Sequence, residues 1–247
     1  MKLFKKSLFT LGCLGLFATT AFAASGLGEV QVFTDTQVKF IEAVENDQLS
    51  VAKELLAAGI TPNQMVRQGD PALVRAIRLG YSNMVRLLLD QPGLDVNMSS
   101  SYGENALMLA AFSGNMNLTK ELLNKGASVS KTIGWSALHY AATNGHDEIV
   151  KLLIEKGANV NARTDMGVTP LYMAARGKHR KAVMTLLRAG AYRDLCNINL
   201  QSPSDAARKA GDTELADYLA IDRCIEPDDS PFKAKIASAE KKQPAKK

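Results

Sequence analysis

Two short apolar runs, separated by a turn, stand out between residues 134 and 163. In the first run Leu138, Ala141 and Ala142 recur at the spacing of one helix face, and Asn144-Gly145 then breaks the helix. The second run places four large apolar residues on one side of a second helix: Ile149, Val150, Leu152 and Leu153. Two helices this short cannot bury their apolar faces alone. We therefore expect copies of this unit on either side.

The same pattern recurs along most of the chain in two registers. Paired leucines mark the second helix of each copy at spacings of 30 to 35 residues, the period of a solenoid built from helix pairs. The pairs are Leu55-Leu56, Leu87-Leu88, Leu122-Leu123, Leu152-Leu153 and Leu186-Leu187, with Tyr218-Leu219 as a degenerate sixth. The first helix steps by 31 to 34 residues through Ala72-Leu73, Ala106-Leu107, Ala137-Leu138 and Pro170-Leu171. Agreement between two registers makes the repeat specific.

Two of these copies open on Ser136-Ala137-Leu138-His139 and Thr169-Pro170-Leu171-Tyr172, and further signature pairs are Gly145-His146, Gly157-Ala158 and Val160-Asn161. Through these residues the chain resembles the ankyrin-repeat family, whose repeats carry a Thr-Pro-Leu-His motif. The resemblance implies an all-α ankyrin-repeat solenoid of about six stacked helix-turn-helix repeats with short β-hairpin-like loops, over residues 34–224. The expected repeats are 34–66, 67–99, 100–130, 131–163, 164–196 and 197–224.

Some copies depart from the family pattern. The second repeat has Asp70-Pro71 where Thr-Pro is expected, and residues 90–93 lengthen its second helix or the loop that follows. The third has Met108 in place of the motif histidine. The fifth has Lys178-His179 instead of Gly-His, which puts its turn between the helices in doubt. In the sixth, residues 202–207 are typical of a C-terminal capping repeat, with a polar residue replacing the core leucine.

The first 23 residues are typical of an export signal. Three lysines precede an apolar stretch, and Ala21-Phe22-Ala23 provides a cleavage site, so we expect cleavage after Ala23. The alternative is lipoprotein processing at Cys13, which would leave almost no apolar region upstream. The apolar stretch is too short for a membrane span. A bacterial-style signal predicts a periplasmic protein, with secretion as the alternative, and residues 24–33 form a linker.

The charge of the chain is concentrated outside the repeats. Of the net +5, the first 23 residues contribute +3 and residues 232–247 another +5, which leaves residues 24–231 at about −3. Nucleic-acid binding requires a basic face on the folded body, so we expect no nucleic-acid partner. Residues 225–247 are rich in Lys, Pro, Ala, Asp and Ser and are expected to be a disordered tail. Attachment of this tail to an anionic surface is a further hypothesis.

Two cysteines remain once the signal is removed. Cys196 and Cys224 bracket the last repeat, and an exported protein meets an oxidising environment. We expect a disulfide that closes a loop of about 28 residues and stabilises the terminal repeat by roughly 3–4 kcal/mol. The alternative is two isolated buried thiols.

No pattern of catalytic residues is present. The three histidines, His139, His146 and His179, all fall on signature positions, and the resemblance implies that they serve the fold. The sequence has no HExxH motif, no glycine-rich phosphate loop and no nucleophile elbow. We therefore predict a protein without enzymatic activity, cofactor or metal.

The remaining candidate is a binding surface. The resemblance implies a concave face, made by hairpin tips and inner helices, that binds protein partners. Its variable positions here are Arg67, Arg75, Arg78, Tyr102, Glu104, Phe112, Trp135, Tyr140, Thr143, Asn144, Met166, Val168, Met173 and Arg176. Trp135 is the only Trp, and exposed aromatic residues flanked by arginines are typical of interface hot spots. The alternative is that these rings pack on neighbouring hairpins and stiffen the stack.

We therefore predict a monomeric, non-catalytic binding protein of the periplasm whose partner is another protein. Exported ankyrin proteins of this size include some linked to catalase and peroxide tolerance, which indicates a link to stress protection. The alternative is an immunity protein that inhibits a toxin aimed at the periplasm, such as a lipase effector.

Overall fold

The computed structural model describes residues 33–66, 69–130 and 134–225. The expected signal segment, nearly all of the linker and the Lys-rich tail lie outside these ranges. The chain divides into two compact units, Met1–Phe33 and Thr34–Lys247. Apart from Phe33, all described residues belong to the second unit.

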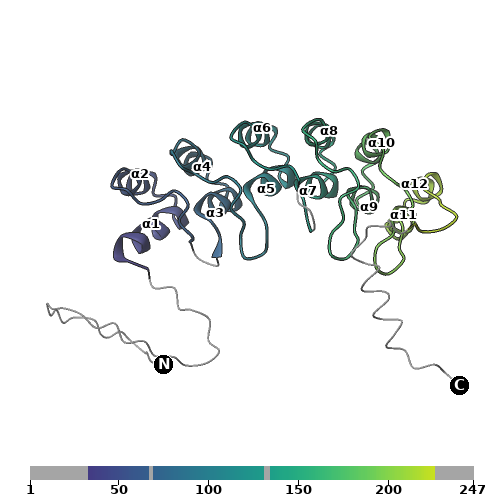
Figure 1. Ribbon diagram of the computed structural model, residues 1–247, viewed down its shortest axis with the longest axis horizontal. Coiled ribbons are helices and arrows are strands. Elements are labelled where there is room, and N and C mark those ends of the chain that lie inside the picture. Colours follow the sequence, from purple (N-terminus) through teal and green to yellow (C-terminus); the bar gives the residue numbers. More distant parts are fainter. Residues whose placement is uncertain (1–32, 67–68, 131–133, 226–247) are drawn as a thin grey trace, which may run out of the picture. The chain divides into compact units, whose positions relative to one another are not determined.

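The described residues form twelve α-helices arranged as six antiparallel pairs (Figure 1). In each pair the odd-numbered helix lies in an inner row and the even-numbered helix in an outer row, and the connecting loops project beyond the inner row (Figure 1). The helices are α1 Asp35–Glu45, α2 Leu49–Ala57, α3 Ala72–Leu79, α4 Ser82–Leu89, α5 Ala106–Phe112, α6 Met116–Asn124, α7 Ala137–Thr143, α8 Asp147–Glu155, α9 Pro170–Arg176, α10 Arg180–Arg188, α11 Pro203–Lys209 and α12 Thr213–Tyr218. Within these ranges no strand forms, and only isolated bridges such as Met65–Pro71 and Ser99–Asn105 close the loops. The all-α ankyrin-repeat solenoid is confirmed.

Small residues allow the inner helices to approach one another closely. Alanine pairs such as Ala141-Ala142 and Ala174-Ala175 are completely buried where α5, α7, α9 and α11 pack side by side. Each leucine pair supplies the layer between inner and outer helices, with Leu122, Leu153 and Leu186 fully buried. The core is therefore one continuous apolar layer that runs through all six pairs.

Most inner helices begin at a side-chain cap in the motif position, whereas α3 begins after Pro71 without one. The hydroxyl of Thr169 accepts a hydrogen bond from the backbone N–H of Tyr172 (3.2 Å), and the following Pro170 suits the first helical position. Ser202 caps α11 in the same way and forms a capping box with Asp205. These caps explain why helices of only seven residues begin where the motif predicts.

The tight turn within each pair requires a left-handed residue. Gly145 supplies it in the fourth repeat with φ 70°. In the fifth repeat Lys178 adopts φ 58° at the same position, and His179 still begins the next helix. The turn is therefore kept in spite of the missing glycine, at the modest energetic cost of a non-glycine residue in this region.

The histidines connect neighbouring repeats. Nε2 of His146 donates to the carbonyl of Phe112 (3.0 Å), and Nε2 of His179 donates to that of Thr143 (2.9 Å). His139 is completely buried: its Nδ1 accepts from the N–H of Ser136 (3.2 Å), and its Nε2 donates to the carbonyl of Val168 (3.0 Å). Burial lowers the pKa of His139 to about 4. Each histidine thus makes a hydrogen bond between neighbouring repeats, which agrees with the structural role expected for all three.

Two departures from the family pattern have local explanations. In the second repeat, α4 ends at Leu89, so residues 90–93 lengthen the loop rather than the helix. In the sixth repeat, Ser204 occupies the core leucine position, and its hydroxyl donates to the carbonyl of Ala216 in α12 (2.7 Å). A buried hydroxyl is tolerated there because it is hydrogen-bonded.

A disulfide joins Cys196 and Cys224, whose Cα atoms lie 5.6 Å apart. It links the last hairpin to the segment that follows α12. Next to it, the N–H of Ile225 donates to the carbonyl of Asp194 (2.8 Å) and completes a parallel bridge with Leu195. The expected disulfide is confirmed, and it fastens both ends of the terminal repeat together.

Candidate protein-binding surface

Three aromatic rings form a connected cluster across α5 and α7. The ring centroids of Phe112 and Tyr140 are 5.8 Å apart, and those of Trp135 and Tyr140 are 5.7 Å apart, both in edge-to-face geometry. Phe112 is 45% exposed and Trp135 40% exposed. We call Phe112, Trp135 and Tyr140 the aromatic cluster. Trp135 also lies edge-to-face against the buried ring of His139, at 5.6 Å, so its base is fixed while much of its surface faces solvent.

Tyr102 lies on the preceding hairpin and is 75% exposed. It is not among the ring–ring contacts found in the described part of the chain, and its backbone N–H is held by the hydroxyl of Ser100 (3.2 Å). A large aromatic side chain is thus presented to solvent on a fixed backbone. Such a ring has no packing duty in the stack.

A chain of polar contacts holds Tyr140 in place. Its hydroxyl donates to Oε1 of Glu104 (2.7 Å), and Oε2 of Glu104 accepts from Arg78 (3.0 Å). Arg78 also pairs with the buried carboxylate of Asp70 (3.2 Å). Burial and the hydrogen bond to Glu104 raise the pKa of Tyr140 well above its usual value. The phenol therefore stays protonated and keeps donating to Glu104.

The polar chain continues into the first repeat through Arg75. Its guanidinium pairs with Glu45 (2.7 Å), and this hydrogen bond raises the pKa of Arg75. Only 15% of each of these two side chains is exposed. Arg75 was expected on the binding surface, but its side chain is largely buried and its charge is neutralised by the carboxylates of Glu45 and Asp70. These contacts stabilise the surface from within, so the side chains of Arg75, Arg78 and Glu104 contribute less to the area that a partner could contact.

The other predicted surface residues differ in exposure. Met166 is 47% exposed and Arg176 is also exposed, whereas Val168 is half-buried. Met173 is only 6% exposed, so the expectation that it contacts a partner is wrong. It occupies the same helical position as Tyr140, but its flexible unbranched chain fills the gap between helices instead of protruding. Arg67 lies outside the described residues.

Asn144 and Thr143 are bonded within the stack. The amide of Asn144 donates to the carbonyl of Phe112 (2.7 Å), and the hydroxyl of Thr143 donates to the carbonyl of His139 (2.7 Å). Asn144 thereby fixes the end of α5 beside the aromatic cluster. The structure brings Phe112, Trp135, Tyr140 and Asn144 together, and Tyr102 lies on the hairpin of the same third repeat as Phe112.

Two apolar residues on one hairpin are exposed although the sequence did not single them out. Ile198 is 42% exposed and Leu200 67% exposed, both on the hairpin before α11. A signal was available, because the position of Leu200 is Gly69, Gly103, Gly134 and Gly167 in the preceding repeats. Four repeats have glycine at this position and the sixth has a large apolar residue. Folding of the hairpin does not require that residue, which indicates another role.

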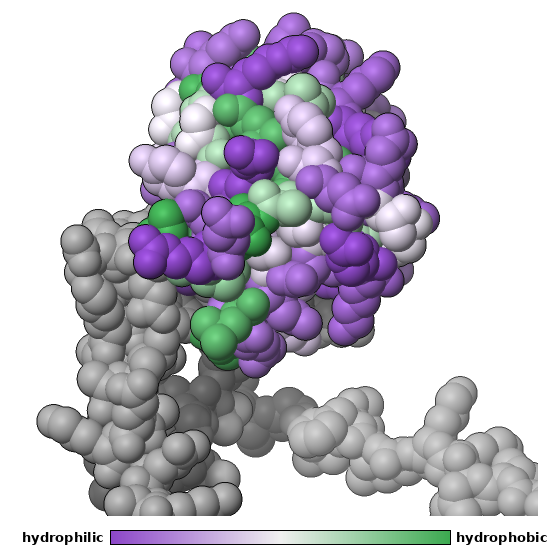
Figure 2. Space-filling view, turned by 90° about the vertical axis from the view of Figure 1, so that its right-hand side faces the viewer, coloured by the Kyte–Doolittle hydropathy of each residue, from purple (hydrophilic) through white to green (hydrophobic). Residues whose placement is uncertain are grey.

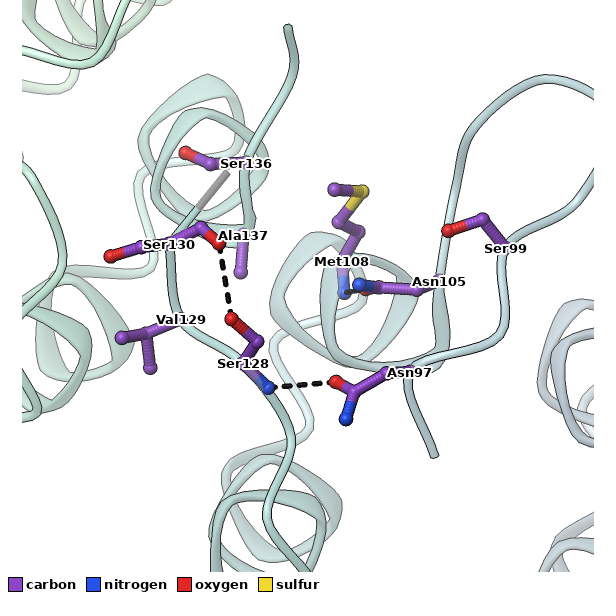
Figure 3. Close-up of a pocket in the computed structure, with 9 residues that line it drawn as sticks. All are labelled: Asn97, Ser99, Asn105, Met108, Ser128, Val129, Ser130, Ser136 and Ala137. Carbon is purple, nitrogen blue, oxygen red and sulfur yellow. Dashed lines mark hydrogen bonds between the residues drawn. The ribbon is translucent and has the colours of Figure 1, made fainter. Parts of the chain in front are cut away.

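A cavity of about 120 Å³ lies where Met108 replaces the motif histidine (Figure 3). It is lined by Asn97, Ser99, Asn105, Met108, Ser128, Val129, Ser130, Ser136 and Ala137. Asn97 accepts from the N–H of Ser128 (2.8 Å) and Asn105 from that of Met108 (3.0 Å), so these amides serve the hairpins (Figure 3). The volume is well below the roughly 300 Å³ at which ligand pockets begin.

Within the described ranges, His, Cys, Asp and Glu do not gather into any group of three or more that could hold a metal ion. The same residues include no helix that is long and apolar enough to cross a membrane.

Comparison with known proteins agrees with the architecture. A model of ankyrin repeats (3 copies) matches residues 40–133 and 130–202, which is more than half of the chain. Alpha-latrocrustotoxin-Lt1a of Latrodectus tredecimguttatus is 34% identical over 88 residues, 36% of this chain and 6% of the toxin. The human photoreceptor ankyrin repeat protein is 36% identical over 84 residues, 33% of this chain and 18% of that protein. The chain thus spans a small part of these relatives. It belongs to the ankyrin-repeat family, whose repeats form a generally non-catalytic module for protein–protein interaction.

Proposed function

We propose that the chain binds a protein partner through the aromatic cluster together with Tyr102. The observation that carries the proposal is the exposure of Tyr102, Phe112 and Trp135 on two adjacent repeats. Aromatic residues supply much of the binding energy at interfaces because they bury a large area with few rotatable bonds. Clusters of exposed rings are uncommon on surfaces that stay in water.

The mechanism is rigid display. Tyr140 is held by Glu104, and Glu104 is held by Arg78, while Asn144 fixes the end of α5. The surface is therefore ordered before a partner arrives, and little conformational entropy is lost on binding.

The alternative is that the rings only stiffen the stack. The edge-to-face contacts of Phe112 and Trp135 with Tyr140 are consistent with that role. Tyr102 favours binding, since it is 75% exposed and lies outside those contacts. A side chain that only stiffened the stack would be packed against it.

The setting we propose is the periplasm of a bacterium, after cleavage behind Ala23, with secretion as the alternative. The disulfide between Cys196 and Cys224 supports an oxidising compartment. In that setting the protein acts as a monomer with a role in peroxide or stress protection. The alternative role is that of an immunity protein against a toxin such as a lipase effector. A catalase encoded next door would favour the first role, and a secreted lipase or nuclease the second.

The test is affinity capture from periplasmic extract. The wild type is compared with a double variant, Trp135→Ala plus Tyr102→Ala, by quantitative mass spectrometry. The matched control is Tyr192→Ala plus Tyr218→Ala, which removes two rings that are 60% and 51% exposed, one on the loop after α10 and one at the end of α12. We expect the cluster variant to lose a partner at least tenfold while the control retains it. Equal recovery by all three proteins would show that the cluster is not the binding site.

A further inference from the structure

The hairpin before α11 holds Leu200 in an unfavourable conformation. Its φ is 58°, in the left-handed region, and the glycines at the same position of four preceding repeats have φ between 71° and 101°. Leucine is rarely found there because its Cβ crowds the backbone. The side chain is also 67% exposed, so burial does not offset the strain. A strained, exposed residue of this kind is typical of a functional site.

Hydrogen bonds keep this hairpin in one conformation. Oδ1 of Asn197 accepts from the N–H groups of Asn199 (2.9 Å) and Gln201 (3.0 Å), and the carbonyl of Asn197 accepts from the N–H of Leu200 (2.9 Å). Next to it, Cys196 is fixed by the disulfide. The hydrogen-bonded hairpin therefore holds the side chain of Leu200 in one defined position, and it also imposes the unfavourable positive φ on this residue.

Leu200 belongs to a larger apolar surface on the last two hairpins. The N–H of Ile198 donates to the carbonyl of Met166 (3.1 Å), which places these two hairpin tips side by side. Met166, Ile198 and Leu200 are 47%, 42% and 67% exposed, and we call them the apolar ridge. A view from the C-terminal repeats shows hydrophobic atoms at the lower edge, on the side of the hairpin loops, beneath a largely hydrophilic surface (Figure 2).

Two cations lie on the inner helices behind this ridge. Arg176 and Lys209 each stand seven residues after the helix cap, on the adjacent helices α9 and α11, and both are exposed. Seven helical residues span about 10 Å, so the cations lie roughly two turns from the hairpins. In the described part of the chain neither has a carboxylate within 4.0 Å, whereas Arg78, at the same position of α3, is paired with Glu104. The nearest acidic residue of α11, Asp205, is held in the capping box by Ser202.

We infer that the apolar ridge, together with Arg176 and Lys209, is a docking site for a protein segment that carries both apolar and acidic residues. Charge complementarity favours this occupant, because two cations that no carboxylate of the described residues pairs lie about two helical turns behind an apolar strip. An anionic lipid surface is disfavoured, since it calls for a broad basic face and Asp165 is exposed beside Met166. The inference rests on the proposed binding function and extends it from the third and fourth repeats to the fifth and sixth.

Leu200→Gly separates binding from folding. It removes the strain and restores the residue found in the other repeats, so we expect the variant to unfold at the same urea concentration as the wild type or a higher one. A second variant, Arg176→Glu plus Lys209→Glu, reverses two exposed charges that form no ion pair with any residue that the structure describes. The control is Lys120→Glu plus Arg188→Glu, which makes the same charge change on the outer helices α6 and α10.

The probe is a phage-displayed library of random peptides, selected on the wild-type protein and then measured as labelled single peptides by fluorescence anisotropy. We expect the selected peptides to combine acidic and apolar residues. Both Leu200→Gly and the Arg176/Lys209 variant should weaken them about tenfold, and the outer-helix control should not. Peptides that are basic, or that bind all variants equally, would overturn the inference. So would cosedimentation with phosphatidylglycerol vesicles that the Arg176/Lys209 variant abolishes, because the occupant would then be a lipid surface.

The aromatic-cluster variant distinguishes this inference from the proposed function. If Trp135→Ala plus Tyr102→Ala loses the captured partner and Leu200→Gly does not, the cluster is the binding site and the inference about the ridge is wrong. If Leu200→Gly loses the partner and the cluster variant retains it, the ridge is the site and the proposed role of the cluster is wrong. Loss in both cases supports one continuous surface.

Discussion

Reduction of the Cys196–Cys224 disulfide should destabilise one repeat rather than the whole protein. The closed loop has a sequence separation of 28 residues, and the chain-entropy model gives about 3–4 kcal/mol for a loop of that length. The terminal repeat has a neighbour on one side only, since α11 packs on α9 and α12. Because repeats interact with their nearest neighbours, the loss should be confined largely to α11 and α12.

Two spectroscopic signals can separate these outcomes. Far-UV circular dichroism reports on all helices, whereas the fluorescence of the only Trp, Trp135, reports on the fourth repeat. In urea with a reducing agent, we expect a new early transition in the dichroism, with a small amplitude because α11 and α12 have only 7 and 6 residues. The fluorescence midpoint should change little. Cys196→Ala plus Cys224→Ala, measured without reductant, controls for effects of the reducing agent.

The reasoning would be refuted by either of two results. If both signals shift together by the full amount, the disulfide stabilises the stack as one cooperative unit, and the nearest-neighbour description does not hold. If neither signal shifts, the hydrogen bond of Ser204 to Ala216 and the packing of α11 on α9 hold the terminal repeat without the disulfide.

Two further predictions concern groups inside the stack. Burial lowers the pKa of His139 to about 4, whereas a histidine in the unfolded chain titrates near 6.5. The unfolded state therefore binds the proton first as the pH falls. We expect the free energy of unfolding to decrease between pH 6.5 and pH 4. The loss is about 3 kcal/mol, measurable as a urea midpoint against pH; a His139→Gln variant with the same acid sensitivity would contradict this assignment. Tyr140→Phe keeps the ring but removes the donor to Glu104, so it should destabilise the protein by about 1 kcal/mol. An unchanged unfolding midpoint would show that the hydroxyl does not brace the cluster.

The fold could be predicted from the sequence because local signals and long-range ones agree. The caps at Thr169 and Ser202, the buried alanine pairs and the paired leucines all recur with the same period, and each repeat needs only its neighbours. Even the fifth turn, which lacks its glycine, keeps its geometry through Lys178, because a single left-handed lysine costs little compared with the packing it preserves.

The surface was less predictable. Periodicity identifies which face of a helix a residue occupies but not how far its side chain protrudes. Met173 and Tyr140 occupy equivalent positions and were both expected on the surface, but Met173 is buried and Tyr140 is only half-buried. The burial of Arg75 could not be read from the sequence, because its partner, Glu45, lies 30 residues away in another repeat. Leu200 was overlooked because its significance comes from comparing one hairpin position across repeats, not from its own neighbours in the sequence.

The bonds between repeats also determine how the stack responds to mechanical force. At three junctions a side chain at the start of an outer helix reaches back to a carbonyl at the end of the preceding inner helix: Tyr81 to Glu45, His146 to Phe112 and His179 to Thr143. At the junction between the second and third repeats the corresponding residue, Asn115, instead caps its own helix by accepting from the N–H of Leu118. At the last junction Asp212 likewise caps its own helix but also pairs with Arg180 of the fifth repeat, so among the described outer-helix starts Asn115 makes the weakest link to its neighbour. A pull applied to the two ends should therefore open the stack first between α4 and α6, where the pair of Arg78 and Glu104 would break. The protein would extend as two blocks, with the aromatic cluster and the apolar ridge on the same one.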